Sequence, residues 1–328
     1  LSSLRWPGRP KLPAGNPSWT YMVESPFGQF AIFVGHVENG ARYPFEVWVN
    51  GNEQPRGLGA VAKTLSMDMR AQDKAWLRMK LEMLARTAGS DAFDCPMPPE
   101  GEPMRVPSMV AAFARIVRHR VDQLGAFERE DGPAPVLDTL FAKKEPKTGT
   151  DGTLSWTVDV LNAVSGDDFL LILKELVLPG GQRRPYSVWL AGSYPRALDG
   201  LCKLLSLDMR VIDPAWIGMK LRKLLTYAEP LGDFMARVPG TERQQNFPST
   251  VAYIARLIIH RYAMLGVLDE RGYPVTEMGV LEMPDDERGR TTYARVSGKL
   301  CAECGNAAVV LRDGCEFCTA CGAIGACG

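Results

Sequence analysis

The chain has 328 residues, of which 46% are hydrophobic and 23% charged, the proportions of an ordinary soluble globular protein. Lys plus Arg equals Asp plus Glu, so the net charge is zero. Nucleic-acid-binding proteins usually carry a basic excess, so nucleic acid is not an expected partner. No apolar run reaches the roughly 18–20 residues of a membrane helix, and the first residues contain no apolar core of a secretory signal. We therefore expect about two domains and no membrane contact.

Beyond an N-terminal linker at 1–17, the dominant feature of the chain is an internal duplication. "SWTYMVES" (18–25) recurs as "SWTVDVLN" (155–162), and "LSMDMRAQDKAWLRMKL" (65–81) recurs as "LSLDMRVIDPAWIGMKL" (205–221). "PSMVAAFARIVRHRVDQLG" recurs as "PSTVAYIARLIIHRYAMLG". The period is far longer than that of solenoid repeats, so each copy is expected to be a domain. We place repeat 1 at 18–127 and repeat 2 at 155–283.

Both copies show the same order of predicted elements. Short apolar segments, "FAIFVGHV" and "FEVWVNG" in repeat 1, predict a strand hairpin, and repeat 2 has matching segments. Three stretches with helical apolar spacing follow. An Asp precedes the second helix of each copy, and Gly125 ends the third helix of repeat 1. The predicted fold class is α+β, with a small antiparallel sheet and helices in each repeat.

Two polar linkers separate these units from each other and from the C-terminus. Residues 128–154 mix charge, Pro and Gly around a short apolar patch, which predicts a linker that docks a short element. Residues 284–299 are polar and precede a cysteine-rich end, which predicts a tethered C-terminal module at 300–328.

Six of the eight cysteines lie in that module, in "CAECGNAAVVLRDGCEFCTACGAIGACG" (301–328). Cys301-x-x-Cys304-Gly and Cys318-x-x-Cys321-Gly have the form of zinc knuckles, and the residues between them predict a strand and a turn. The segment is therefore predicted to be a zinc ribbon that folds on Zn²⁺. Spacing equally allows Cys301, Cys304, Cys315 and Cys318 as the four ligands.

Either assignment leaves Cys327 and one other cysteine free of metal. A spare surface thiol is one interpretation. The other is a redox pair that forms a disulfide and is reduced again by thiol exchange. The two remaining cysteines, Cys95 and Cys202, lie far apart and outside any motif, so the chain is not a disulfide-stapled secreted scaffold, and a reducing cytoplasmic location is expected.

The ending "CAECGN…RDGCEFCTACG…CG" resembles the C-terminus of adenosylcobalamin-dependent (class II) ribonucleotide reductases. The duplicated "LSxDMR…AW…MKL" units resemble the C-terminal TSCPD-type repeats of the long bacterial form. The resemblance runs from about Trp19 to Gly328, although the label motif Thr-Ser-Cys-Pro-Asp is absent from this sequence.

The resemblance implies an accessory part of a ribonucleoside-diphosphate reductase that makes deoxyribonucleotides for DNA synthesis. It implies that a terminal cysteine pair re-reduces the active-site disulfide and that a thioredoxin-like protein restores the pair. Cys327 would pair with Cys315, or with Cys321 if zinc holds Cys315; we favour Cys315 because Cys318-Thr-Ala-Cys321-Gly is the better knuckle.

The family's catalytic barrel, with its radical cysteine and cobalamin-binding surface, has no match in this sequence. The chain alone is therefore expected to be inactive, with the barrel as its partner in the same polypeptide or as a separate subunit, and with adenosylcobalamin bound elsewhere. The alternatives are a zinc ribbon that binds protein or nucleic acid without a redox role, and repeats that mediate homo-oligomerisation.

Repeated polar and aromatic residues in the two copies predict structural roles. Asp68 and Asp208 recur in "DMR" and are expected to tie a helix to a neighbouring loop. The tryptophan pairs are expected to be anchors in the core or between domains, and Arg183 and Arg184 to be solvated at a hairpin tip; these tryptophans are Trp76, Trp216, Trp48 and Trp189.

Overall fold

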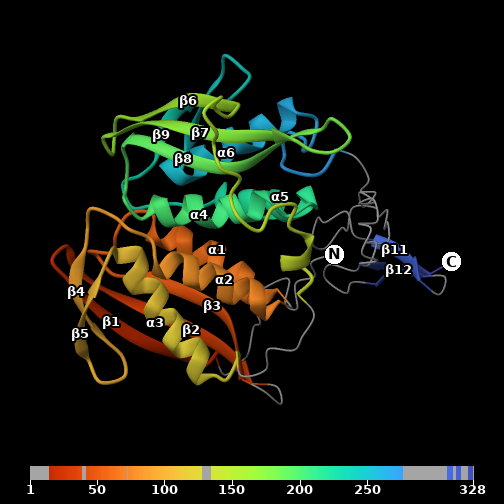
Figure 1. The fold of residues 1–328 in the computed structure, drawn as a ribbon. Coiled ribbons are helices and arrows are strands. Elements are labelled where there is room, and N and C mark those ends of the chain that lie inside the picture. Colours follow the sequence, from red (N-terminus) through yellow and green to blue (C-terminus); the bar gives the residue numbers. More distant parts are fainter. Residues whose placement is uncertain are drawn as a thin grey trace.

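The two copies of the repeat form two lobes of the same architecture, stacked through their helices (Figure 1). The computed structural model describes residues 15–38, 42–71, 73–127 and 134–275, and three strands of the C-terminal segment. Within these residues the chain is α+β, with helices and antiparallel sheets, as predicted. No helix in the described ranges combines the length and the hydropathy needed to cross a bilayer.

Repeat 1 begins with a three-stranded antiparallel sheet of order β1-β2-β3. Two helices follow the sheet in the chain, and a short hairpin separates them from a third helix (Figure 1). The elements are β1 (Ser18–Ser25), β2 (Gly28–Glu38), β3 (Arg42–Asn50), α1 (Leu58–Arg70), α2 (Lys74–Ala85), β4 (Phe93–Met97), β5 (Glu102–Val106) and α3 (Met109–Gln123).

Repeat 2 has the same order of elements, preceded by a short 3-10 helix, η1 (Leu137–Thr139). Its elements are β6 (Ser155–Asn162), β7 (Asp167–Val177), β8 (Arg183–Ser193), α4 (Leu198–Met209), α5 (Pro214–Leu224), β9 (Phe234–Arg237), β10 (Gln244–Phe247) and α6 (Thr250–Met264). Three further strands lie in the C-terminal segment: β11 (Val309–Arg312), β12 (Cys315–Cys318) and β13 (Ile324–Cys327).

The helices begin where the capping residues of the sequence place them. The Asp73 carboxylate accepts the Trp76 N–H at 2.8 Å, and Asp213 caps α5 by accepting the Ala215 N–H, with Pro214 in the first turn. Ser108 caps α3 by accepting the N–H of Ala111. The predicted helices and the hairpins β2–β3 and β7–β8 are confirmed.

Four elements of the fold were not predicted from the sequence: the first strand of each sheet and the hairpins β4–β5 and β9–β10. The β4 segment has a strand signal, because Phe93, Cys95 and Met97 are buried and alternate with exposed residues. The strands β1 and β6 contain fewer buried positions, since each forms the outer edge of its sheet.

Two expectations about side-chain burial were wrong. Trp48 and Trp189 are 54% and 51% exposed, because both occupy strand positions on the outer face of their sheets. Arg184 is only 2% exposed, although Arg183 beside it is open to solvent. Arg184 begins a run of buried residues at 184–188 of β8, and its guanidinium donates to the carbonyl of Ile212 at 3.2 Å.

The lobes meet through four helices, with α1 against α4 at the centre (Figure 1). Two lysines and two aspartates of these helices form a buried tetrad, and all four side chains are 0% exposed. Lys80 Nζ lies 3.0 Å from an oxygen of Asp68 in its own repeat and 2.6 Å from Asp208 in the other. Lys220 Nζ lies 2.6 Å from Asp68. The expectation that these aspartates tie a helix to a loop was wrong, since they join the two repeats.

Burial and charge act in opposite directions on the titration of the tetrad. Burial alone raises the pKa of Asp68, but Lys220 and Lys80 outweigh burial and hold that pKa below its ordinary value. For Asp208 burial prevails and the pKa is raised, in keeping with one carboxylate oxygen that has no hydrogen-bond partner. Burial also lowers the pKa of Lys220. The aspartates are thus unequal although their sequence context is repeated.

Aromatic side chains close the tetrad from water. The Trp76 indole N–H donates to Asp68 at 2.8 Å, and Trp216 donates to Asp208 at 2.7 Å. The two indoles pack edge to face with centroids 6.3 Å apart, which confirms their predicted role between domains. The linker docks beside them, as predicted, because the N–H of Val136 donates to the Asp73 carboxylate at 2.9 Å.

We expect Lys80→Met to lower the free energy of unfolding by about 3–5 kcal/mol, because it leaves buried carboxylates without their cation. Adding Asp208→Asn should recover part of that loss, since Lys80 is the nearest cation to Asp208. Urea unfolding of the single and double variants measures the coupling.

Lys203→Met is the matched control for that cycle. Lys203 lies on α4 and is partly exposed, with no ion pair within the described ranges, so its removal should change stability by less than about 0.5 kcal/mol. Strictly additive losses in Lys80→Met and Asp208→Asn would contradict a shared tetrad.

Candidate functional site

The described strands of the C-terminal segment place two predicted redox cysteines opposite each other. Strands β11 and β12 form an antiparallel hairpin, and β12 pairs in turn with β13. In the β12–β13 register the Cα atom of Cys315 is the partner of the Cα atom of Cys327. Opposed residues of antiparallel strands have Cα atoms about 4.5–5.5 Å apart. That separation falls within the roughly 4.4–6.8 Å of disulfide-bonded pairs.

The predicted zinc ligands are less completely described. Cys318 is the last residue of β12, paired with Val309 of β11. Cys301, Cys304 and Cys321 lie outside the described residues, as does the linker 284–299. Among the residues that the structure describes, no group of three or more His, Cys, Asp or Glu side chains could hold a metal ion. The zinc site therefore stays a prediction.

The two cysteines within the repeats are unsuited to thiol exchange. Cys95 and Cys202 are both buried, and burial raises the pKa of each thiol above its ordinary value, most strongly for Cys202. Because the thiolate is the reacting form, these two thiols are chemically inert at neutral pH. We therefore expect any thiol exchange at the terminal cysteines.

A second candidate site lies where the two repeats meet beside the N-terminal ends of α1 and α4. An open cleft of about 680 Å³ is lined by both lobes, and a Pro-Arg turn from each repeat enters it. These turns are Pro55-Arg56 and Pro195-Arg196. A cleft built at a junction of two domains is a common place for a ligand.

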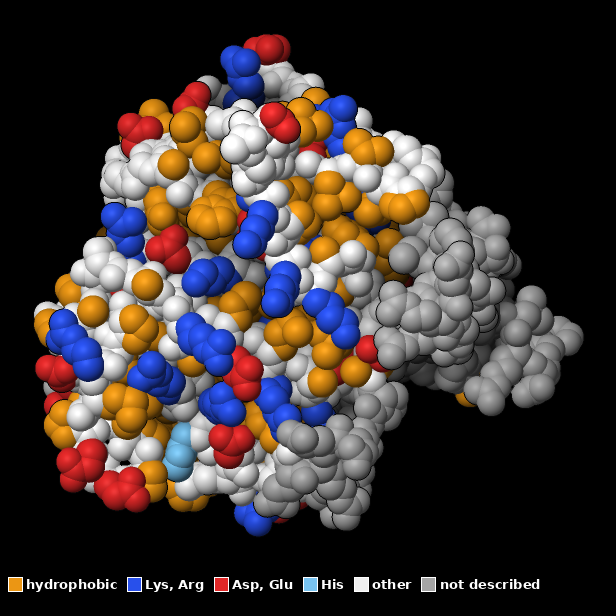
Figure 2. Space-filling view, viewed as in Figure 1, with side chains coloured by type: hydrophobic (Ala, Val, Ile, Leu, Met, Phe, Trp, Pro, Cys, Tyr) orange, Lys and Arg blue, Asp and Glu red, His pale blue; other side chains and the backbone are white. Residues whose placement is uncertain are grey.

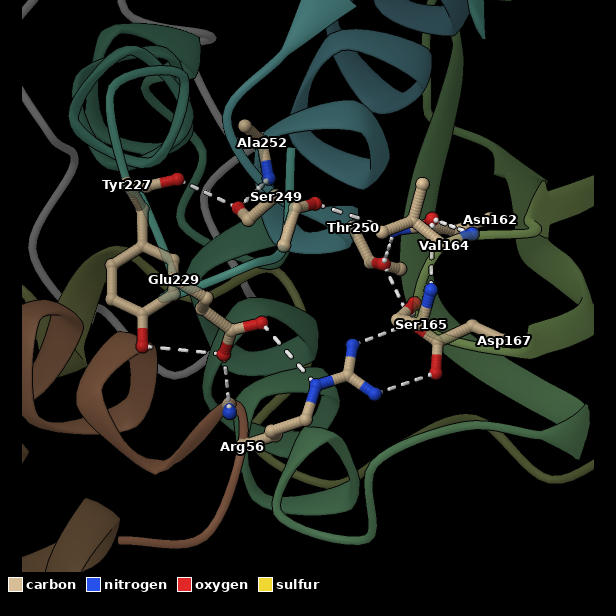
Figure 3. A network of polar contacts seen from close by, with 12 residues as sticks. Arg56, Asn162, Val164, Ser165, Asp167, Tyr227, Glu229, Ser249, Thr250 and Ala252 are labelled. Atoms are coloured by element: carbon tan, nitrogen blue, oxygen red, sulfur yellow. Dashed lines mark hydrogen bonds and ion pairs between the residues drawn. The ribbon is translucent and has the colours of Figure 1, made fainter. Parts of the chain in front are cut away.

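Arg56 forms the centre of a polar network across this junction (Figure 3). Its guanidinium donates two parallel hydrogen bonds to Asp167 of repeat 2, at 2.9 and 2.7 Å. Its Nε lies 3.8 Å from Glu229, whose other oxygen accepts the N–H of Gly57 at 2.6 Å. Thr250 and Ser165 also donate to Asp167. Two carboxylates of one repeat thus hold an arginine of the other.

The titration of these groups fits a structural ion pair. Burial raises the pKa of Asp167, but hydrogen bonds from Arg56, Thr250 and Ser165 outweigh burial and leave that pKa below its ordinary value. Burial raises the pKa of Glu229 despite its bond to Gly57. Arginines and carboxylates from both repeats line the cleft, so the arrangement offers charged groups that can bind and orient a ligand.

The sequence predicted candidate site residues among the terminal cysteines, but it did not predict the cleft. Arg56 and Asp167 are 111 positions apart and belong to no local motif. One signal was available: the Pro-Arg pair occurs at the same place in both copies of the duplication, immediately before a helix.

We expect Asp167→Asn to cost about 2 kcal/mol of unfolding free energy at pH 7, because the charged hydrogen bonds of Arg56 are lost. The folded pKa of Asp167 lies below the ordinary 3.8, so the stabilisation is complete above that value and is lost as pH falls through the folded pKa. Urea titrations should give a constant difference between wild type and variant at pH 7 and 5, and a smaller one below pH 3.8. A difference that already shrinks between pH 7 and 5 would contradict this assignment.

Comparison of the chain with protein-family models, with curated proteins and with solved structures finds no match.

Proposed function

We propose that this chain is the C-terminal accessory part of an adenosylcobalamin-dependent ribonucleotide reductase, in which a terminal cysteine pair supplies reducing equivalents. The two repeats are the scaffold, and the C-terminal segment is the carrier. The observation that supports this best is the β12–β13 register, in which Cys315 and Cys327 are directly opposed. Twelve positions separate them in the chain, so the pairing depends on the strands and not on local sequence.

The proposed exchange is balanced in electrons and protons. A thiolate of the terminal pair attacks a disulfide of the catalytic partner and forms a mixed disulfide, which the second terminal thiol resolves. The partner's disulfide gains two electrons and two protons, and the terminal pair becomes a disulfide. A thioredoxin-like dithiol then reduces that disulfide and is oxidised in turn. The inert thiols of Cys95 and Cys202 leave this path free of competition from the repeats.

Zinc suits the remaining four cysteines of the segment. Cys301, Cys304, Cys318 and Cys321 would supply four thiolates, the donor set of a tetrahedral structural site. Metal binding would then fold the segment and keep these thiols out of exchange. If zinc instead takes Cys315, Cys321 becomes the partner of Cys327; the strand register favours the first arrangement.

The catalytic steps belong to a partner. In the complete enzyme adenosylcobalamin supplies the radical chemistry, and no residue identified in this chain holds it. The proposed partners are the catalytic barrel, in the same polypeptide or as a separate subunit, and a thioredoxin-like reductant in the cytoplasm. The substrate class is a ribonucleoside diphosphate, reduced to its deoxy form for DNA synthesis.

Mild oxidation of the zinc-loaded full chain should produce a Cys315–Cys327 disulfide. Cleavage after Arg312 and after Glu316 separates these cysteines into the peptides 313–316 and 317–328. Mass spectrometry without reduction should find the two peptides linked, and prior treatment with thioredoxin should release them.

Cys327→Ser removes one member of the proposed disulfide. Cys202→Ser is the control, because it removes a buried thiol that is not expected to react. The first should release peptide 313–316 unlinked, and the second should not change the map. A disulfide confined to peptide 317–328 would assign the pair to Cys321 and Cys327. Terminal thiols that stay reduced in the wild type would leave a zinc ribbon without a redox role.

Turnover of the complete enzyme with thioredoxin should fall by at least about 100-fold in Cys327→Ser, because the mixed disulfide can no longer be resolved. Turnover with dithiothreitol, a small dithiol that reaches the active site directly, should be nearly unchanged. Deoxyribonucleotide formation under both reductants measures the two rates. Equal turnover of variant and wild type with thioredoxin would refute the carrier role.

A further inference from the structure

The linker between the repeats shows how a segment that leads into a repeat is held. The N–H groups of Val136 and Leu137 donate to the Asp73 carboxylate of repeat 1, each at 2.9 Å. The linker then crosses to repeat 2, where Leu140 forms an antiparallel bridge with Val211. It therefore contacts both lobes before the first strand of repeat 2 begins.

The linker is held on the outer face of the second sheet through Glu145. Its carboxylate accepts a hydrogen bond from Lys174 Nζ of β7 at 2.9 Å and one from the indole N–H of Trp189 of β8 at 3.3 Å. The Lys174 side chain is 16% exposed, and its ammonium lies 5.7 Å from the centroid of the Trp189 ring. The contact thus combines a carboxylate of the linker with a lysine and an indole of the sheet.

The first sheet has the same indole but the opposite charge. Trp48 of β3 occupies the position of Trp189, whereas the position of Lys174 is taken by Gly35, whose partner in the register is Glu46. The Glu46 side chain fills the space above Gly35, because a Cβ atom there would lie 2.7 Å from the Cγ atom of Glu46. Glu46 is 3% exposed. A buried carboxylate is stable when it is paired with a cation, so this place favours a basic group.

The segment that leads into repeat 1 carries the matching reversal of charge. "LSSLRWPGRPK" (1–11) aligns without gaps with "LDTLFAKKEPK" (137–147), and the two share Leu, Leu, Pro and Lys at equivalent positions. Arg9 stands at the position of Glu145. Residues 1–14 lie outside the described residues, and 1–11 contain three basic residues and no acidic one. Repeat 2 pairs a linker carboxylate with a sheet lysine, and repeat 1 offers a segment arginine and a sheet carboxylate.

The starting point of the linker also has a counterpart in the other repeat. Asp213 corresponds to Asp73, and each is the N-cap of a helix. Asp73 accepts three N–H groups, two of them from the linker. Within the described ranges the Asp213 carboxylate accepts only the N–H of Ala215, and burial raises its pKa. Asp213 can therefore receive backbone N–H groups from the start of the N-terminal segment, as Asp73 does from the linker.

The helical face of the molecule is a poor place for a basic segment. Figure 2 shows that Lys and Arg side chains gather across the middle of this face, over the helices where the repeats meet. Charges of the same sign repel, so this face does not attract the segment. Glu46 lies on the first sheet instead, and a buried carboxylate there attracts an arginine.

We propose that residues 1–11 dock across the two repeats as the linker does, with Arg9 paired to Glu46 beside Trp48. An arginine suits this place because its guanidinium binds a carboxylate and stacks on an aromatic ring. The two segments cross between the lobes in opposite directions, the linker from Asp73 to the second sheet and the N-terminal segment from Asp213 to the first. This contact involves none of the cysteines, so it is independent of the proposed redox role.

The test is the rate at which trypsin cleaves the Lys11–Leu12 bond of the full chain, followed by mass spectrometry of the released peptides that end at Lys11. A docked segment is cleaved only when it opens, so the rate follows the open population. Glu46→Gln and Arg9→Gln should each raise the rate by about tenfold or more, because the charged hydrogen bonds are lost.

Two double variants show whether Arg9 and Glu46 act on each other. Arg9→Gln with Glu46→Gln should raise the rate no more than either single change, since both remove the same contact. Arg9→Glu with Glu46→Lys should restore slow cleavage, because it recreates the pair that Glu145 and Lys174 form in repeat 2.

Glu24→Gln is the matched control, because Glu24 is an exposed glutamate of β1 in the same sheet. Thermal unfolding of each variant checks that the fold is retained, and the Arg9 variants leave every described residue unchanged. The proposal is overturned if Arg9→Gln leaves the cleavage rate at the wild-type value, if Glu24→Gln raises it as much as Glu46→Gln, or if the effects of Arg9→Gln and Glu46→Gln multiply in the double variant.

Discussion

Four buried charges, paired both within each repeat and across the interface, link the two lobes of this molecule. If the lobes separated, Asp208 would lose the ammonium of Lys80, and Asp68 would lose that of Lys220. Leaving charges buried and unpaired costs several kcal/mol, so the lobes cannot slide or rotate without breaking all these contacts together. An apolar interface of the same size would tolerate small shifts. The tetrad thus fixes the register of one repeat on the other. It thereby also fixes the relative positions of the residues at their junction.

The cleft is one consequence of this fixed register. Because α1 and α4 meet at the centre of the interface, the Pro-Arg turns before them are brought to the same junction. Duplication alone would give two identical arginine sites. The copies have diverged instead: Asp167 and Glu229 hold Arg56, whereas Arg196 lies against the ring of Tyr194. The Arg56 network thus adds a second set of charged contacts between the lobes.

The fold class and most helices could be predicted from the sequence because their signals are local. Caps such as Asp73 and Ser108 lie within three residues of the N–H groups they accept, and apolar spacing shows which face is buried. The edge strands and the tetrad could not be predicted, since their partners are distant in the chain: Lys80 and Asp208 are 128 positions apart. Arg184 was misjudged because a hairpin tip in the sequence proved to be the inward-facing start of a strand. For the cysteines, spacing left two candidate partners for Cys327, and the strand register places Cys315 opposite it.

Rigid repeats and a terminal cysteine pair serve complementary purposes if the chain carries electrons to a partner. Thiol exchange requires a thiolate that can reach another protein, whereas the interior of the repeats suppresses thiolates by burial, as Cys202 shows. Cys315 and Cys327 belong instead to the strands β12 and β13 of the C-terminal segment. The opposed positions of Cys315 and Cys327 then allow a disulfide to close across two strands with no rearrangement of the repeats. In such a carrier the two repeats would keep their arrangement while the oxidation state of the terminal segment changed with each cycle.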